Sequence, residues 1–98
     1  MPKKLAPVHP GEILRETLTD VGLSMNRLAK EIGVPANRIT SIVAGTRSIT
    51  GETALRLARY FGTSPEYWIN LQAHYDLEVA RDEWDEAVRT QVRPLHAA

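Results

Sequence analysis

One short segment, residues 36–41, carries side chains suited to contact with DNA bases. Asn37 can form two hydrogen bonds with the edge of an adenine, and Thr40 and Ser41 can meet thymine or a phosphate. Ala36 is expected to project outward beside them. Arg38 can grip guanine or a phosphate, or it can lie along the protein surface. We predict that this segment reads bases, and the alternative is that it forms only a polar helix face.

Three further polar residues are candidates for contact with DNA phosphates. Asn26 and Arg27 fall in the first turn of an expected helix, where free N–H groups and the helix dipole favour an anion. Arg47 lies in the loop GTRSIT, residues 45–50, which follows the base-reading segment. For Arg27, a role as an ordinary surface charge is equally open.

These side chains need a scaffold, and residues 24–45 have the pattern of two helices joined by a tight turn. Ser24 is suited to cap a helix over residues 25–32, and Gly33 stands where the chain must turn. Pro35 favours the start of a second helix that ends at Gly45. The residues expected to face inward are Leu28, Ile32, Val34, Ile39 and Ile42. The pattern is that of a helix-turn-helix, whose second helix lies in the DNA major groove.

Two more helices are expected on either side of this pair. The first starts near Pro10, with His9 in its cap region, and its core-facing positions recur at helical spacing. Those positions are Ile13, Leu14, Leu18 and Val21. The other follows Thr50 as its N-cap and ends at Gly62. Its apolar face is expected to hold Ala54, Leu55, Leu57, Ala58 and Phe61, with Ile49 tucked under the preceding loop and Arg56 and Arg59 in solvent.

A fifth helix should begin after Ser64 and continue to about Val92, because no proline or glycine interrupts this stretch. One apolar stripe of this helix holds Trp68, Leu71, Tyr75 and Val79, and an opposed stripe holds Ala73, Leu77, Ala80, Trp84 and Val88. Two opposed stripes need two surfaces to bury them. We therefore predict a homodimer in which Leu77, Ala80, Trp84 and Val88 meet a second copy. The alternative is a break near Asp76 that folds the last segment back as a sixth helix.

The composition limits the classes of protein that this chain can belong to. The 98 residues include no cysteine, which excludes disulfides and thiolate metal sites and fits a cytoplasmic protein. We expect no signal peptide and no membrane span. The net charge is zero, but residues 1–61 hold nine Lys or Arg against five acidic residues, and residues 62–98 hold three against seven. One end is therefore suited to face phosphate and the other to face away from it.

The expected organisation is a flexible tail over residues 1–8, a helix-turn-helix domain over residues 9–75 and a helical extension over residues 76–98 that dimerises. An enzyme is not expected, because acid–base catalysis needs titratable groups that converge on one cleft. His9, His74 and His96 fall at a helix start, in a helix and in the tail, with no carboxylate pair or metal-ligand spacing beside them. We expect no cofactor and no metal.

Three segments together resemble HigA-type antitoxins of the Xre and Cro/repressor-like helix-turn-helix group. They are HPGEILRE at residues 9–16, LAKEIGVPANRITSIVAGTRSIT at residues 28–50, and ALRLARYFGTSPEYWINLQAHYDLEVAR at residues 54–81. The middle segment is shared by very many regulators. The HPGEILRE opening and the GTSPEYWINLQ part are much more specific.

The resemblance implies an all-α, five-helix, lambda-repressor-like helix-turn-helix domain with an extended C-terminal helix. It implies a dimer that binds double-stranded DNA, at an operator in its own promoter, and that neutralises a HigB-like, mRNA-cleaving toxin. The family's base-reading positions correspond to Ala36, Asn37, Thr40 and Ser41, supported by Arg38 and Arg47. Some members stand alone without a toxin, so a stand-alone Xre-type transcriptional regulator is the alternative.

Overall fold

The computed structural model describes residues 6–96, and these residues form five α-helices with no strand. The helices are α1 (Pro10–Val21), α2 (Met25–Ile32), α3 (Ala36–Val43), α4 (Gly51–Phe61) and α5 (Pro65–Gln91). The predicted all-α, five-helix fold is confirmed, and each helix begins within a residue of its expected start. Of the predicted tail over residues 1–8, residues 1–5 lie outside the described part of the chain, as do the last two residues.

Local signals set most of the helix ends. The side chains of Ser24 and Ser64 each accept a hydrogen bond from the backbone N–H three residues later, at 3.1 Å in both cases. His9 caps α1 in a less common way, because its Nδ1 accepts the N–H of Gly11 at 2.9 Å. Capping of this kind satisfies N–H groups that have no partner inside the helix. The cap role expected for His9 is therefore confirmed.

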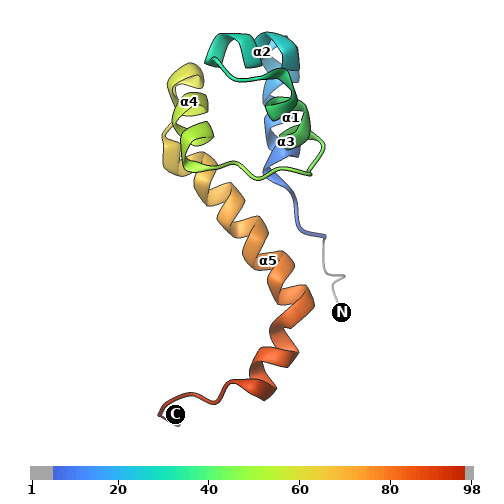
Figure 1. Cartoon of the computed structure of the whole chain (residues 1–98), viewed down its shortest axis with the longest axis vertical. Coiled ribbons are helices and arrows are strands. Elements are labelled where there is room, and N and C mark those ends of the chain that lie inside the picture. The colour runs from blue at the N-terminus through green and yellow to red at the C-terminus, as the bar shows by residue number, and fades with distance from the viewer. Residues whose placement is uncertain (1–5, 97–98) are drawn as a thin grey trace.

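The core lies where α1 to α4 meet the first turns of α5 (Figure 1). Its largest fully buried side chains include Trp68, Leu14, Leu28, Ile39, Ile42 and Leu57. The helices pack in a ring of neighbours, α1 on α3 and α5, α2 on α3 and α4, and α4 on α5. Burial of these apolar side chains is the main force that holds the short helices together.

Two residues predicted to face the core are exposed instead. Val21 is 59% exposed because α1 ends there, and Leu23 packs against the core in its place. A hydrophobic residue two positions beyond a glycine-terminated helix commonly makes this contact. Leu55 is 61% exposed, since the buried stripe of α4 follows Ala54, Leu57 and Ala58 and leaves its neighbour outside.

The last helix, α5, is unbroken from Pro65 to Gln91. The predicted alternative, a break near Asp76 with a sixth helix folded back, is therefore wrong. Its first turns pack against α4 and α1, and Trp68 and Gln72 are buried there. Beyond these turns α5 projects from the bundle, which gives the chain an elongated shape of 52 × 30 × 22 Å (Figure 1). Among the described residues, no helix is both long and apolar enough to cross a membrane.

Candidate nucleic-acid interface

The predicted base-reading residues lie on the exposed side of α3. Ile39 and Ile42 are fully buried and fix which side of this eight-residue helix faces the core. Ala36, Asn37 and Thr40 are consequently exposed, as helical periodicity requires, and Ser41 is half-buried at the edge. The hydroxyl group of Thr40 donates to the carbonyl oxygen of Asn37 at 3.3 Å. This bond uses the backbone of Asn37, and the residue itself is exposed at the start of the helix.

The position of α3 depends on a close crossing with the start of α1. Gly11 is buried, and a Cβ atom at this position would overlap the carbonyl oxygen of Ile42. Only a residue without a side chain lets the two helices approach so closely. α3 is therefore held in place by its backbone contact with α1 as well as by its own buried apolar side chains.

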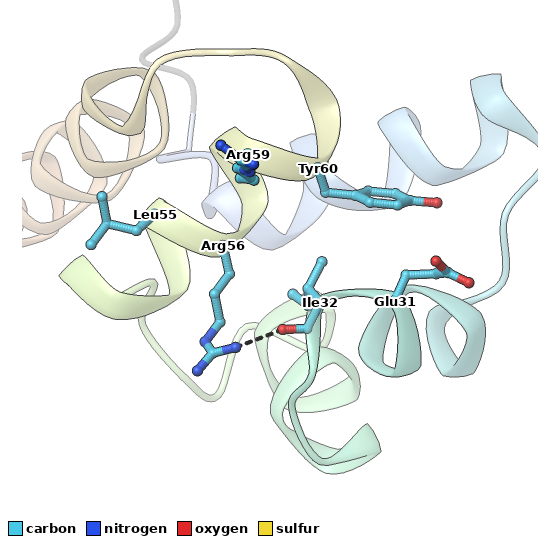
Figure 2. A pocket seen from close by; sticks show the side chains of 6 residues that line it. All are labelled: Glu31, Ile32, Leu55, Arg56, Arg59 and Tyr60. Carbon is cyan, nitrogen blue, oxygen red and sulfur yellow. Dashed lines mark hydrogen bonds between the residues drawn. The ribbon is translucent and has the colours of Figure 1, made fainter.

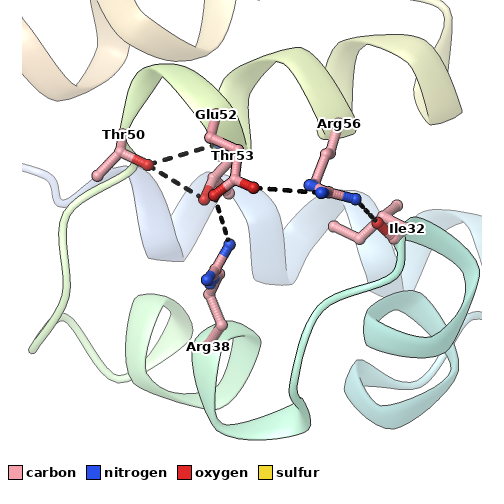
Figure 3. A network of polar contacts seen from close by, with 6 residues as sticks. All are labelled: Ile32, Arg38, Thr50, Glu52, Thr53 and Arg56. Carbon is pink, nitrogen blue, oxygen red and sulfur yellow. Dashed lines mark hydrogen bonds and ion pairs between the residues drawn. The ribbon is translucent and has the colours of Figure 1, made fainter.

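Arg38 differs from its neighbours on α3, because its side chain is directed toward α4 (Figure 3). Its Nη1 donates to Glu52 Oε1 at 3.0 Å, and its side chain is only 25% exposed. Of the alternatives predicted for Arg38, a place along the protein surface is the one seen in this structure. Contact with guanine would require the ion pair to open.

At the start of α2, both predicted phosphate-contact residues are exposed, and one of them, Arg27, forms bonds within the helix. The backbone N–H of Arg27 donates to Ser24 Oγ, and its guanidinium pairs with Glu31 at 2.8 Å. This hydrogen bond to Glu31 raises the pKa of Arg27, so the side chain carries its charge at any physiological pH. Asn26 is exposed beside it. Only Nε of Arg27 donates to Glu31, so the two Nη groups of this exposed side chain can still donate to a phosphate.

The loop after α3 is held by α5. The backbone N–H of Ile49 donates to Gln72 Oε1 at 2.8 Å, and Gln72 Nε2 donates in turn to Asp76 Oδ1 at 2.9 Å. Ile49 is buried, as predicted, while Arg47 remains exposed on the outer part of the loop. Gln72 was not singled out from the sequence. Its spacing of four residues from Trp68 was the available signal that it lies on the buried stripe.

A groove between α2 and α4 is lined by Glu31, Ile32, Leu55, Arg56, Arg59 and Tyr60 (Figure 2). Arg56, predicted to be solvated, instead donates from Nη1 to the carbonyl oxygen of Ile32 at 2.8 Å. The one carboxylate of the groove, Glu31, already pairs with Arg27. This lining contains no pair of groups suited to exchange a proton with a substrate. In residues 6–96 no cluster of three potential metal ligands occurs either.

The predicted dimer residues form an exposed apolar strip along the outer half of α5. Leu77, Trp84 and Val88 are each more than half exposed, and they line a shallow groove with Ala80, Arg81 and Asp85. The opposed stripe behaves differently, because Trp68 is buried and Leu71, Tyr75 and Val79 are partly buried against the same chain. One stripe is thus buried within the chain and the other is exposed, and burial of the exposed stripe by a second copy stays a prediction.

Two helices joined by a three-residue turn, with the second presenting polar side chains to solvent, define a helix-turn-helix DNA-binding protein. Comparison with known proteins agrees, since the model of the family described as Helix-turn-helix matches residues 14–68. This family contains DNA-binding regulators rather than enzymes, in line with the expectation from the sequence.

Among known proteins, the chain is 34% identical to Antitoxin HigA-1 of Vibrio cholerae over 93 residues, which are 94% of this chain and 87% of the relative. A solved addiction module antidote protein of the HigA family from Coxiella burnetii is 48% identical, with a TM-score of 0.90. That match covers 92% of this chain and 99% of the other.

The structure of Pseudomonas aeruginosa antitoxin HigA with the higBA promoter is 40% identical, with a TM-score of 0.88 and the same coverage, 92% and 99%. This chain belongs to the HigA family of helix-turn-helix antitoxins. The family resemblance drawn from three segments of the sequence is thereby confirmed.

Proposed function

We infer that this protein is the antitoxin of a type II toxin–antitoxin system and represses its own promoter by sequence-specific DNA binding. Its partner is a HigB-like, mRNA-cleaving toxin, which it neutralises in the cytoplasm. The observation that carries this inference is the match over nearly the whole chain to an antitoxin HigA whose structure includes the higBA promoter. That match covers 92% of this chain, and the five helices lie between Pro10 and Gln91.

We propose that α3 enters the major groove and that Ala36, Asn37, Thr40 and Ser41 face the base edges. Their place on the exposed side of α3 supports this role. Asn37 is the strongest candidate for direct recognition, because an amide can pair with two groups of adenine. Asn26, Arg27 and Arg47 are proposed to contact phosphates, which fixes the register of α3 without reading sequence.

Two copies are proposed to associate through Leu77, Ala80, Trp84 and Val88, whose exposure on α5 supports an interface. A two-fold dimer places two α3 helices on an inverted repeat, with half-sites about 34–36 Å apart. Occupation of that site would exclude transcription of the operon. Binding should weaken steeply with added salt, because each neutralised phosphate releases counterions.

The toxin-related part of the proposal is tested in cells with the small open reading frame beside this gene. We expect its expression alone to stop growth, and co-expression with this protein to restore growth and to yield a co-purifying complex. If the product of this reading frame does not stop growth and does not bind this protein, the antitoxin role is overturned. The stand-alone Xre-type regulator would then be the remaining function.

The DNA-related part is tested by titrating the promoter duplex and a scrambled duplex of the same length. Asn37→Ala should lose about 1–3 kcal/mol of binding free energy on the promoter duplex. Its binding to the scrambled duplex should be unchanged, because the substitution removes no charge. An equal loss on both duplexes would show that Asn37 does not read bases.

A further inference from the structure

Three charged side chains connect the end of α2, the start of α3 and the first turn of α4 (Figure 3). Glu52 receives a hydrogen bond from Arg38 Nη1 on one carboxylate oxygen and from Arg56 Nη2 on the other, at 3.0 and 3.1 Å. Arg56 uses its second nitrogen, Nη1, to bind the carbonyl oxygen of Ile32, the last residue of α2. The chain of contacts therefore runs from α2 through α4 to α3.

Each part of this network satisfies a local requirement. The carbonyl groups of the last turn of a helix have no partner within it, and a cation there also complements the helix dipole. Arg56 meets both needs at the end of α2. Glu52 lies in the first turn of α4, where a carboxylate is favoured. The hydrogen bonds from Arg56 and Arg38 lower the pKa of Glu52, so the carboxylate stays ionised between them.

Besides this ion pair, the N-terminal end of the recognition helix α3 has few polar restraints. Its N-cap residue, Pro35, supplies no side-chain hydrogen bond, in contrast to the caps of α1, α2, α4 and α5. Its buried residues, Ile39 and Ile42, and the close approach of Ile42 to Gly11 hold the middle and the C-terminal end of the helix. Hydrogen bonds between ionised groups are short and directional. The ion pair from Arg38 to Glu52 therefore restrains α3 at its N-terminal half, next to Asn37.

We propose that Glu52 is a positioning residue for DNA recognition, which acts by holding Arg38 and thereby sets the placement of α3 in the major groove. In this arrangement Arg38 contributes to specificity while it faces α4 rather than a base. The inference rests on the proposed function, since it concerns recognition of the operator. It adds that a carboxylate outside the helix-turn-helix governs how well the base-reading side chains are aligned.

The competing explanation is that Arg38 leaves Glu52 to contact DNA. The two explanations predict opposite signs for the same substitution. If Glu52 only sequesters a DNA-binding arginine, Glu52→Gln frees Arg38 and removes a negative charge, so operator binding becomes stronger. If Glu52 positions α3, Glu52→Gln weakens operator binding even though the protein gains net positive charge.

The experiment compares the intact protein, Glu52→Gln, Arg38→Met and the double variant on operator and scrambled duplexes. We expect Glu52→Gln to lower operator affinity about threefold to tenfold, with scrambled-duplex affinity unchanged or slightly higher. The double variant should bind the operator no worse than Arg38→Met alone, because each substitution breaks the same ion pair between Arg38 and Glu52. The control is Glu16→Gln, which makes the same change in net charge on the exposed face of α1. It should not lower the ratio of operator to scrambled affinity.

Two results would overturn the proposal. One is stronger operator binding by Glu52→Gln. The other is a salt dependence that falls by about one counterion in Arg38→Met, which would indicate a lost phosphate contact. Thermal unfolding of each variant checks that it remains folded.

A DNA-independent measurement separates this inference from the proposed function. If the unsubstituted protein fails to bind its promoter, the proposed function is overturned. Amide hydrogen exchange in free protein then still decides the role of Glu52. Faster exchange in α3 of Glu52→Gln, but not of Glu16→Gln, supports the positioning role, and equal exchange in the two variants contradicts it.

Discussion

Two arginines in the helix-turn-helix already form ion pairs within the protein before any DNA is bound. Arg27 is paired with Glu31, and Arg38 is paired with Glu52. Exposed ion pairs of this kind contribute little to stability, because water screens the two charges. Their larger effect is on geometry, because they hold long side chains in one orientation before DNA arrives. Asn37 is a simpler case, since its amide is exposed and keeps its full capacity to form hydrogen bonds with a base.

The close approach of α1 to α3 makes Gly11 a critical single residue. Gly11→Ala places a methyl group on the carbonyl oxygen of Ile42, so one of the two helices must move. We expect the free energy of unfolding to fall by about 2–3 kcal/mol, the cost of overpacking against a backbone that cannot rotate away. Urea unfolding followed by circular dichroism measures this loss.

The matched control for this prediction is Gly51→Ala at the start of α4. An added Cβ atom there meets nothing within 4 Å, and the backbone is helical. This variant should be neutral or more stable by up to about 1 kcal/mol, because alanine restricts the unfolded chain. Equal destabilisation by both substitutions would refute the account of the α1–α3 crossing.

At the scale of elements, α1 begins at a point where three helices meet. His9 is buried there, caps α1 through Nδ1, and places its ring edge-on against Tyr75 of α5, with ring centres 4.8 Å apart. A helix-capping residue thus also contacts the helix that carries the proposed dimer surface. Nδ1 can accept the hydrogen bond from Gly11 only while the imidazole is neutral. Protonation turns Nδ1 into a donor, and the bond is then lost.

The stability of this junction should depend on pH. Burial lowers the pKa of His9 below 6.5, and this outweighs the opposing influence of Asp76 and Glu12. A lowered pKa in the folded state means that the unfolded chain takes up the proton first. The contribution of His9 is therefore fully present above about pH 6.5 and is lost as the pH falls toward the lower folded-state value.

Urea unfolding at pH 7.5 and pH 5.5 tests this prediction. His9→Ala should cost about 1 kcal/mol at pH 7.5 through loss of the cap, and less at pH 5.5. His9→Asn, which restores an oxygen acceptor without a titrating ring, should be less sensitive to pH than the unsubstituted protein. If His9→Asn shows the same sensitivity, another group causes the pH dependence.

At the scale of the whole molecule, the two halves of α5 have different surroundings. The first half closes the core and holds the loop of Arg47 through Gln72. The second half projects from the bundle with its apolar strip exposed. Residues 62–98 as a whole hold seven acidic residues against three basic ones. Charge and shape together are consistent with a DNA-binding end and an association end on one elongated chain.

The proposed dimer is tested by placing a charge on the apolar strip. Trp84→Glu should give a monomer in sedimentation equilibrium, because a carboxylate would be buried against a second α5. Operator affinity should fall about 100-fold or more, since two linked half-site contacts become independent. The control, Leu55→Glu, places the same charge on an equally exposed apolar residue of α4 and should leave the dimer intact. A dimeric Trp84→Glu would refute this interface.

Local features of the sequence were enough to predict much of this structure. Ser24, Thr50 and Ser64 were expected as caps, and Pro10 and Pro65 as helix starts, because capping and the fixed φ of proline act within a few residues. The spacing of Leu28, Ile39 and Ile42 indicated the inward faces of α2 and α3 for the same reason. The family was recognised from three short segments, and the fold followed from that resemblance as well as from the helical pattern.

Tertiary packing decided the rest. The apolar pattern could not show that Val21 and Leu55 stay exposed, because periodicity marks a face but not which parts of it a neighbour covers. It also left open whether α5 breaks near Asp76. The contacts of Arg38 with Glu52 and of Ile49 with Gln72 join residues 14 and 23 positions apart. Hydrogen bonds over such separations depend on the angles at which whole helices cross, and those angles are set by the packing of the complete core.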